Sequence, residues 1–382
     1  MRLVYVTEGV PNRDPERGDG SSLIPYGVLG ALPDDVEVTL LTYTGDVPVP
    51  PEVAARCADV QLLRPRDPRL ALLRSLVSRA HPGAEAVCTP EARAAVARLS
   101  ADADVTLVHG PHVTPLVHAV RGPVVLQAVD PWSMRLGMEV ELATGLRRRF
   151  RARKARQALV AERALPQRVR LLTVGQRDAE RWSALLGRPV RAVPNGTETP
   201  AGPRVRVPGP PTVCFVGSLH YEPNIESATV LVREVAPQVW EQAPGTRFLL
   251  AGRQPTPAVL ALAEDRVEVR PNVPSMADVF AESDVAVFPD RHGLGIRNSV
   301  TEALAAGLPV VATAAGAREQ PPHPLLRVAG SEGELVRLVR EALTGQAAGP
   351  GPATPAEPVR TWRTVAEEYL EECRASLSQV DR

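Results

Sequence analysis

Short apolar runs alternate with longer, partly polar stretches along most of the chain. The runs are rich in Val and Leu and are bounded by Gly, Pro, Asn or Asp, which is typical of strands buried on both faces. Strands separated by helices predict mostly parallel sheets that helices cover on both sides. We expect strands at residues 3–7, 36–41, 60–63, 105–109, 124–127, 171–175, 190–193, 212–219, 247–251, 267–269, 284–288, 310–312 and 326–328.

The stretches between these runs predict helices. Pro68 fits the first position of one of them, where its missing N–H costs nothing. The charged stretch 139–163 is expected to be one continuous helix, whose exposed side is either a solvated face or a patch that meets a membrane surface. The expected helices cover residues 23–32, 68–79, 91–99, 139–163, 177–186, 225–240, 298–306, 332–343 and 361–376.

The length of the chain predicts two domains. A sequence of 382 residues is too long for one ordinary core. Residues 197–211 are rich in Pro and Gly and have the composition of an interdomain linker. We expect a first domain at 1–203, completed by a C-terminal helix within 358–382, and a second domain at 204–357.

Composition excludes several classes of protein. The 44 basic and 44 acidic residues balance, and aromatic residues make up only 4%, which argues against nucleic-acid binding. The four cysteines form no C-x-x-C pair, so we expect neither a zinc site nor a redox motif, and no metal. We find no signal peptide and no apolar run long enough to span a membrane, and therefore expect a cytoplasmic protein. The preference for Arg over Lys suggests a GC-rich bacterial genome.

Residues 283–313 combine a buried strand, a glycine-punctuated loop and a helix. The helix is expected to begin at Asn298 or Ser299 and to stop at Gly307. Backbone N–H groups and the helix dipole at such a place favour an anion, typically phosphate. Glu302 lies one turn inside the helix, where its carboxylate could accept hydrogen bonds from hydroxyl groups. The alternative is an ordinary strand–helix turn of some other doubly wound sheet.

This segment resembles the signature of GT-B glycosyltransferases of the family-4 type. The family pattern E-G-F-G-x-x-x-x-E-A-x-A-x-G-x-P-V-V places its first Glu on Leu294, so that residue is missing here. A bacterial subgroup of sugar transferases, with R-G-I-Q-N-K-V-L-E-A-M-A, is closer to residues 295–302. The matching residues are Gly295, Glu302, Ala303, Ala305, Gly307, Pro309, Val310 and Val311.

The resemblance extends over nearly the whole chain. Residues 217–224 match the subgroup pattern G-S-M-x-Y-x-P-N, in which Ser218 and Pro223 replace the Arg and Lys that clamp the diphosphate in most family-4 members. Residues 272–274 match the turn that the family uses to read the base. The resemblance implies an α/β GT-B fold, in which two Rossmann-like domains face each other across a cleft and the last helix crosses back to the first domain.

The resemblance also implies a reaction. A sugar would pass, with retention of configuration and without a metal or other cofactor, from a UDP-, GDP- or dTDP-linked donor to a hydroxyl acceptor. Arg297 is our candidate for the missing diphosphate cation, with Arg253 and Arg291 as second choices. Asp130, or alternatively His112, would orient or deprotonate the acceptor, and Gly20 and Ser21 belong to a loop that closes over the phosphates. The expected donor-binding residues are Gly217, Ser218, Gly252, Arg253, Val273, Gly295, Ile296, Asn298 and Glu302.

Other functions remain open. The losses at Leu294, Ser218 and Pro223 motivate a catalytically degenerate partner or binding protein. Another GT-B enzyme, such as a nucleotide-sugar epimerase, is a third possibility. A phosphorylase is disfavoured, because it would need a lysine that binds pyridoxal, and Lys154 lies outside the second domain. The sequence leaves open the nucleotide, the sugar, the oligomeric state and the acceptor, which could be a natural product of antibiotic type or a cell-surface glycan.

Overall fold

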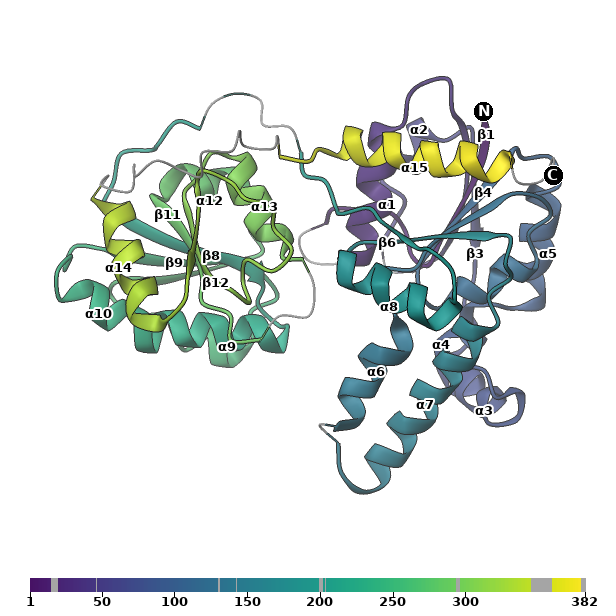
Figure 1. The fold of residues 1–382 in the computed structure, drawn as a ribbon, viewed down its shortest axis with the longest axis horizontal. Helices are drawn as coiled ribbons and strands as arrows, with labels where there is room; N and C mark the ends of the chain where they lie inside the picture. Colours follow the sequence, from purple (N-terminus) through teal and green to yellow (C-terminus); the bar gives the residue numbers. More distant parts are fainter. Residues whose placement is uncertain are drawn as a thin grey trace. The chain divides into compact units, whose positions relative to one another are not determined.

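The chain folds into two compact units, each built around one parallel sheet (Figure 1). The computed structural model describes residues 1–14, 20–45, 47–129, 131–141, 143–198, 202, 204–292, 296–344 and 359–378, with residues 20 and 21 described only in their backbone. The first unit comprises Met1–Arg13, Gly18–Asn195 and Trp362–Arg382, and the second comprises Asp14–Arg17 and Gly196–Thr361. The expected α/β class with two doubly wound sheets is confirmed.

The first unit has a seven-stranded sheet in the order β3-β2-β1-β4-β5-β6-β7. All its strand pairs are parallel. The strand order reverses next to β1, so the carboxyl ends of β1 and β4 bound the crevice where such sheets bind ligands. The strands are β1 (Arg2–Thr7), β2 (Glu37–Tyr43), β3 (Asp59–Leu63), β4 (Val105–His109), β5 (Val124–Gln127), β6 (Val169–Thr173) and β7 (Arg191–Ala192).

Alternate residues of β1 belong to two different cores. Leu3 and Tyr5 pack in one cluster with residues of α1 (Gly20–Ala31) and α15 (Trp362–Leu377). Val4 and Val6 pack on the opposite face. There they meet α4 (Pro82–Val87), α5 (Pro90–Leu99) and α8 (Gln176–Leu186). The last helix therefore completes the first unit, as expected, although it follows the whole second unit in sequence (Figure 1).

The second unit has a six-stranded sheet in the order β10-β9-β8-β11-β12-β13. Its central strands are buried on both faces, which explains their continuous apolar sequences. The strands are β8 (Thr212–Ser218), β9 (Arg247–Arg253), β10 (Val267–Pro271), β11 (Val285–Phe288), β12 (Val310–Thr313) and β13 (Leu326–Ala329). The helices are α9 (Glu222–Val230), the π-helical η2 (Leu231–Val235), α10 (Ala236–Trp240), α11 (Pro257–Leu260), α12 (Met276–Glu282), α13 (Asn298–Ala305) and α14 (Glu332–Leu343).

The structure corrects one expected helix and adds several short ones. Residues 139–163 do not form a single helix, because Thr144 is extended and Gly145 has a φ of 58°. The chain instead forms α6 (Trp132–Glu141) and α7 (Gly145–Arg163). The helices α2 (Pro51–Arg56), α4, α11 and α12 and the 3-10 turn η1 (Thr114–His118) were not expected, since each is too short to show a helical period. The N-cap of α13 is Arg297, not Asn298 or Ser299.

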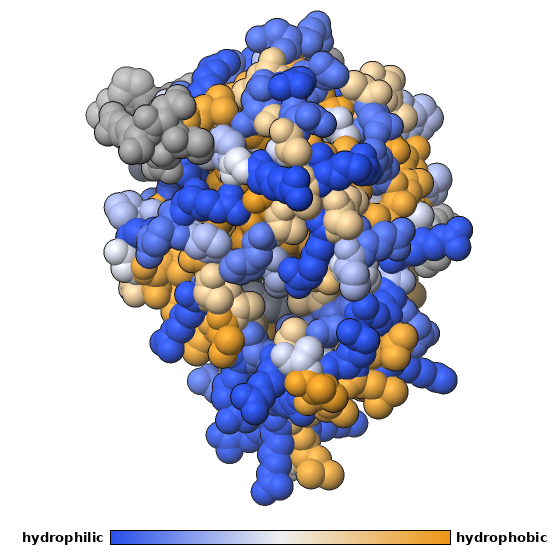
Figure 2. Space-filling model, turned by 90° about the vertical axis from the view of Figure 1, so that its right-hand side faces the viewer, coloured by the Kyte–Doolittle hydropathy of each residue, from blue (hydrophilic) through white to orange (hydrophobic). Residues whose placement is uncertain are grey.

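Helix α3 (Pro68–Ser78) exposes its large apolar side chains and buries its small ones. It buries Ala71 and Ser75. The Ser75 carbonyl oxygen accepts hydrogen bonds from the side chains of Arg153 and Gln157 of α7. The fully described side chains that it exposes include Leu70, Leu72, Leu73, Leu76 and Val77, the last 87% exposed. In Figure 2, hydrophobic residues lie scattered among hydrophilic ones at the lower end of the molecule, the end at which Figure 1 shows α3, α6 and α7.

Candidate functional site

The carboxyl edge of the second sheet brings four of the expected donor-binding residues together. β8 and β9 are parallel neighbours, and their register pairs Gly217 with Gly252 and Ser218 with Arg253. The Arg253 Nη2 donates a hydrogen bond of 2.9 Å to the Ser218 hydroxyl. A Cβ on Gly252 would lie 1.7 Å from the Gly217 carbonyl oxygen, so only glycine fits there. At this edge Gly217 and Gly252 present backbone without side chains, with the Asn224 amide packed against Gly217 and one partly buried arginine beside them.

The turn after β10 is tied to the same edge. Asn272 has a φ of 50°, and its N–H donates to the Gly252 carbonyl at 2.8 Å. Its side-chain oxygen accepts a hydrogen bond of 2.9 Å from the N–H of Gln254. Val273, expected near the base of a nucleotide, follows directly and is buried. The two bonds fix the turn against the end of β9.

Arg297 lies in a buried ion pair behind this edge. Its Nε and Nη2 each donate to one carboxylate oxygen of Asp290 at 2.7 Å, and Nη2 also donates to Asn224 Oδ1 at 2.9 Å. The guanidinium carbon lies 5.3 and 5.0 Å from the ring centres of Phe215 and Phe288. The Arg297 and Asp290 side chains are only 11% and 6% exposed.

The sequence suggested Arg297 as the cation that binds the diphosphate, but the contacts described here are with protein groups. Two of its three nitrogens are taken by Asp290 and Asn224, and a charge-neutralised guanidinium attracts an anion less. The third nitrogen, Nη1, donates to no described residue and lies 3.6 Å from the position of a Cβ on Gly217. A direct role of Arg297 in phosphate binding stays a prediction.

Glu302 lies on α13, partly buried, and no described residue donates a hydrogen bond to its carboxylate. Burial raises its pKa to about 7, and the nearby charge of Arg253 acts in the opposite direction. A carboxylate that lacks a protein donor can accept hydrogen bonds from ligand hydroxyls. Ile296 and Asn298 stand on either side of the Arg297 N-cap and are also partly buried.

Several expected site residues lie outside the described residues. They are Asp130, Gly295 and the side chain of Ser21; Gly20 is described only as the first residue of α1. The neighbour of Asp130, Val129, has a φ of 60°, a strained conformation for a β-branched residue. Strain of this kind often accompanies functional sites, and it marks the carboxyl end of β5 as one place to look.

His112 is held by a carboxylate at the carboxyl edge of the first sheet. Its backbone N–H donates to Glu8 Oε2 at 3.0 Å, and its Nδ1 forms a very short contact with Glu8 Oε1. Glu8 follows β1 and His112 follows β4, two neighbouring strands. The bond through Nδ1 sets the ring orientation and leaves Nε2 for another partner. A Cβ on residue 83 would lie 2.4 Å from this Nε2 and would clash with the His112 ring, so Gly83 leaves room for the ring.

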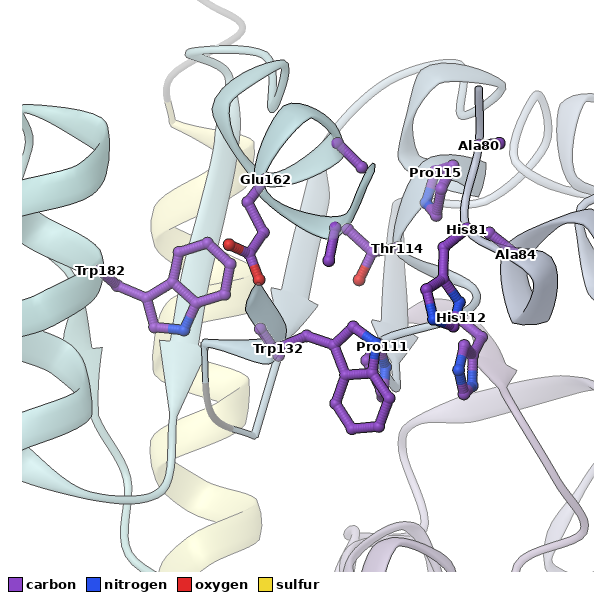
Figure 3. A pocket seen from close by; sticks show the side chains of 13 residues that line it. Ala80, His81, Ala84, Pro111, His112, Thr114, Pro115, Trp132, Glu162 and Trp182 are labelled. Atoms are coloured by element: carbon purple, nitrogen blue, oxygen red, sulfur yellow. The ribbon is translucent and has the colours of Figure 1, made fainter. Parts of the chain in front are cut away.

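An aromatic pocket adjoins His112 (Figure 3). The His81 and His112 rings stack with their centres 5.3 Å apart, and Trp132 meets the His112 ring edge-on at 5.2 Å. Figure 3 shows Trp182 and Glu162 on the other side of the pocket from the two histidines. The lining residues come from the loops after β4 and β5, from α4 and the segment just before it, and from η1, α6, α7 and α8.

Comparison with known structures decides the fold. The chain superposes on Anabaena HepE bound to UDP-glucose with a TM-score of 0.61 and 14% identity, covering 100% of this chain and 98% of that one. It matches a Burkholderia xenovorans trehalose-phosphate synthase (UDP-forming) with a TM-score of 0.60 and 12% identity, over 98% of this chain and 100% of that one. WaaG, a glycosyltransferase of lipopolysaccharide biosynthesis, matches with a TM-score of 0.59 and 13% identity, over 98% of each chain. This chain has the GT-B fold.

Sequence comparison agrees for the second GT-B unit. Residues 210–344 match the family model for glycosyl transferases group 1. A search of curated protein sequences finds no match. The resemblance to GT-B glycosyltransferases expected from the sequence is thus confirmed. Within the part of this GT-B chain that the structure describes, no three His, Cys, Asp or Glu residues form a metal-binding group.

Sequence reasoning missed several residues of both GT-B units. Glu8 was not among the expected site residues, although it directly follows β1 and therefore lies near residues that follow the neighbouring strand β4. Asp290 follows β11 in the same way, and Asn224 belongs to the P-N pair of the matched segment 217–224. No sequence signal brings His81, Trp132 and Trp182 together, because His81 caps α4 while the two tryptophans belong to α6 and α8.

Proposed function

We propose that this protein is a glycosyltransferase that takes a sugar from a nucleotide-sugar donor bound to the second unit. The observation that carries the proposal is the sheet edge at Gly217 and Gly252, with Arg253 and Glu302 beside it. Bare backbone allows a diphosphate to approach closely, a guanidinium suits its oxygens, and a carboxylate suits ribose hydroxyls. The structural neighbours bound to UDP-glucose or named as UDP-forming make UDP-sugars the first donors to test, ahead of GDP-, dTDP- and ADP-sugars.

We assign the acceptor to the first unit, at the pocket beside His112. In the reaction, the bond from the anomeric carbon to the diphosphate oxygen breaks and a bond to the acceptor oxygen forms. In a front-face route that retains configuration, the departing diphosphate oxygen takes the acceptor proton. Arg253 would stabilise the charge of the leaving diphosphate, and the Glu8–His112 pair would orient the acceptor hydroxyl. The route uses no metal or other cofactor.

UDP-glucose or another nucleotide sugar is expected to raise the melting temperature of the protein in a pH-dependent way. The Glu302 carboxyl has a pKa raised to about 7, so it is protonated at pH 6 and ionised at pH 8. Because the ionised form accepts hydrogen bonds, the thermal shift should grow as pH rises through 7. The diphosphate of a nucleotide sugar does not change charge in this range. The measurement is differential scanning fluorimetry at pH 6, 7 and 8 with each nucleotide sugar.

Three variants make this experiment specific. Glu302→Gln should keep a smaller shift with no pH dependence, and Arg253→Ala should lose most of the shift. Arg233→Ala, which removes an exposed arginine of η2 in the same unit, should behave like the unmodified protein. If no nucleotide sugar shifts the melting temperature, the donor site is wrong and a catalytically degenerate GT-B partner becomes the better proposal. A nucleotide-sugar epimerase would bind the donor equally well but would convert it without any acceptor.

We also propose that α3 and α7 contact an anionic membrane surface. The exposed apolar side chains of α3 suit the lipid interface, and α7 carries seven arginines and Lys154 against one acidic residue, the buried Glu162. Within the described residues, no helix combines the length and apolar character needed to cross a bilayer. A cytoplasmic location, the absence of a cofactor and the choice between natural-product and cell-surface acceptors stay predictions.

Vesicles of phosphatidylglycerol and phosphatidylcholine are expected to co-sediment the protein, and vesicles of phosphatidylcholine alone much less so. Leu73→Gln with Val77→Gln should reduce the bound fraction several-fold, because each removes buried apolar area at the interface. Arg148→Gln should reduce it about fivefold at low salt, on the order of 1 kcal/mol per charge. Val205→Gln, at a site of the second unit that is 78% exposed, is the control and should bind normally. Equal binding to both vesicle types would remove this proposal.

A further inference from the structure

The pocket of the first unit contains three nitrogen donors without partners among the described residues. They are His81 Nε2, Trp132 Nε1 and Trp182 Nε1, all of them inaccessible to solvent. His81 and Trp182 are 7% and 2% exposed as whole residues. Buried donors without a hydrogen-bond partner are rare, because burial removes their hydrogen bonds to water and nothing offsets the free energy lost. Three of them around one cavity indicate that something else fills it.

The three groups can only donate. An indole nitrogen has no acceptor capacity. His81 Nδ1 accepts a hydrogen bond of 3.1 Å from the Gly83 N–H, so the ring hydrogen of the neutral form is on Nε2. The ring is neutral, because burial lowers its pKa to about 3, with the nearby His112 and Lys154 acting in the same direction. The missing partner must therefore supply acceptor atoms such as carbonyl or ether oxygens.

The charge of the pocket disfavours an anion. Lys154 and Arg135 lie near His81 and Trp132, but no Lys or Arg is among the lining residues. Glu162, in contrast, lines the pocket with its carboxylate (Figure 3). That carboxylate accepts hydrogen bonds from both the N–H, at 2.8 Å, and the hydroxyl of Ser133. A second negative charge beside Glu162 would be repelled in a site with little water. The acceptor atoms thus belong to a neutral molecule.

The walls of the pocket are flat. The stacked His81 and His112 rings form one side, and the Trp132 indole stands edge-on to both, with centre distances of 6.2 and 5.2 Å. The volume is about 50 Å³, room for about four water molecules or for part of a ring whose remainder lies outside the pocket. Aromatic walls pack against flat apolar groups by stacking and edge contacts.

We propose that this pocket binds a neutral, planar ring that carries hydrogen-bond-accepting oxygens. The inference rests on the proposed function in one respect: it assigns such a ring to the acceptor of the sugar. An acceptor of this class carries a hydroxyl on or next to a conjugated carbonyl ring system. A saturated sugar ring, by contrast, is puckered, and a phosphorylated acceptor is charged.

The test uses three probes of similar size. Acetophenone has a ring and a carbonyl, ethylbenzene lacks the oxygen, and benzoate is anionic. The protein is labelled with 5-fluorotryptophan, and each probe is titrated while the ¹⁹F spectrum is recorded. The four tryptophans are assigned from single Trp→Phe variants. We expect acetophenone to shift the Trp132 and Trp182 signals in a saturable way at millimolar concentration, and to leave Trp240 unchanged.

Two variants separate the donors from the shape of the pocket. His81→Phe keeps a flat ring but removes the nitrogen, and should weaken acetophenone binding about fivefold, the loss of one hydrogen bond. It should leave ethylbenzene binding unchanged. Trp240→Phe is the control. Trp240 belongs to the second unit, outside the pocket, and its Nε1 donates to the Thr246 carbonyl oxygen of the same unit. Circular dichroism establishes that each variant is folded.

Each outcome supports or excludes one kind of ligand for the pocket. Ethylbenzene binding as tightly as acetophenone would overturn the role of the donors, and benzoate binding most tightly would show an anion site instead. No saturable shift with any probe would mean that the pocket holds water alone. A nucleotide-sugar thermal shift together with any of these negative results would leave the transferase standing and remove only this acceptor class. Acetophenone binding without a nucleotide shift would leave a ring-binding protein and remove the transferase.

Discussion

Asp290→Ala is expected to lower the free energy of unfolding of the second unit by about 3–5 kcal/mol, the usual cost of leaving one partner of a buried ion pair alone. Arg297 would lose both bonds to the carboxylate while remaining packed against Phe215 and Phe288. Ser227, whose hydroxyl donates to Asp290 at 2.6 Å, would lose this bond as well and keep only the Pro223 carbonyl as acceptor, at 2.8 Å. The measurement is urea unfolding followed by the ¹⁹F signal of Trp240, the one tryptophan in residues 196–361.

Two further variants test the explanation. Glu234→Ala breaks the exposed pair with Arg291, whose side chains are 37% and 49% exposed, and should cost less than about 1 kcal/mol. The double variant Asp290→Leu with Arg297→Met removes both charges and should recover most of the stability, because it leaves no unpaired charge. If Asp290→Ala costs no more than Glu234→Ala, the pair does not hold the donor edge together as we infer.

Gly252→Ala is expected to destabilise the second unit by about 2–5 kcal/mol and to weaken nucleotide-sugar binding. Its Cβ would lie 1.7 Å from the Gly217 carbonyl oxygen, and its φ of 158° is unfavourable for a side chain. The carbonyl is backbone, so β8 and β9 must separate at the proposed diphosphate site. The same Trp240 signal measures stability, and the thermal shift with nucleotide sugar measures binding.

Gly245→Ala provides the matched control for this substitution. A Cβ on Gly245 meets nothing within 4 Å, and this residue precedes β9 in the same unit. Its effect should remain within about 0.5 kcal/mol. Equal effects of the two substitutions would mean that β8 and β9 can separate freely, and the argument for a closely approached diphosphate would then lose its basis.

The sheets could be predicted because parallel strands that are buried on both faces have continuous apolar sequences. Residues 285–288 and 310–313 are examples, and the local pattern also predicts α13, which lies between them in the sequence. The division of residues 139–163 could not be predicted, since Thr144 and Gly145 carry no Pro or turn pair strong enough to interrupt the charged stretch. Helix α4 begins at Pro82 but has only six residues, fewer than two helical turns, so no period identifies it.

The residues of the candidate sites also differ in whether local sequence could predict them. Gly217, Gly252 and Glu302 could be proposed from motifs because they belong to short segments with recognisable spacing. The role of Arg297 depended on its surroundings: Asp290 is seven residues away, but Asn224 is 73 residues away. Glu8 and His112 are separated by 104 residues and meet only because β1 and β4 are neighbours in the sheet. Pairing across such distances is decided by the fold and leaves no trace in local pattern.

The position of α15 has a consequence for the order in which the protein matures during synthesis. The ribosome makes the second unit before it makes Trp362, Val365 and Tyr369, which cover one face of the first sheet. Until then Leu3, Tyr5 and Leu107 lack part of their apolar cover, and the nascent first unit offers a surface that chaperones recognise. Apart from Asp14–Arg17, the second unit is one continuous stretch, residues 196–361, so the strands and helices described in it have all been made by that time. The half that begins the chain is thus the last to reach its native state.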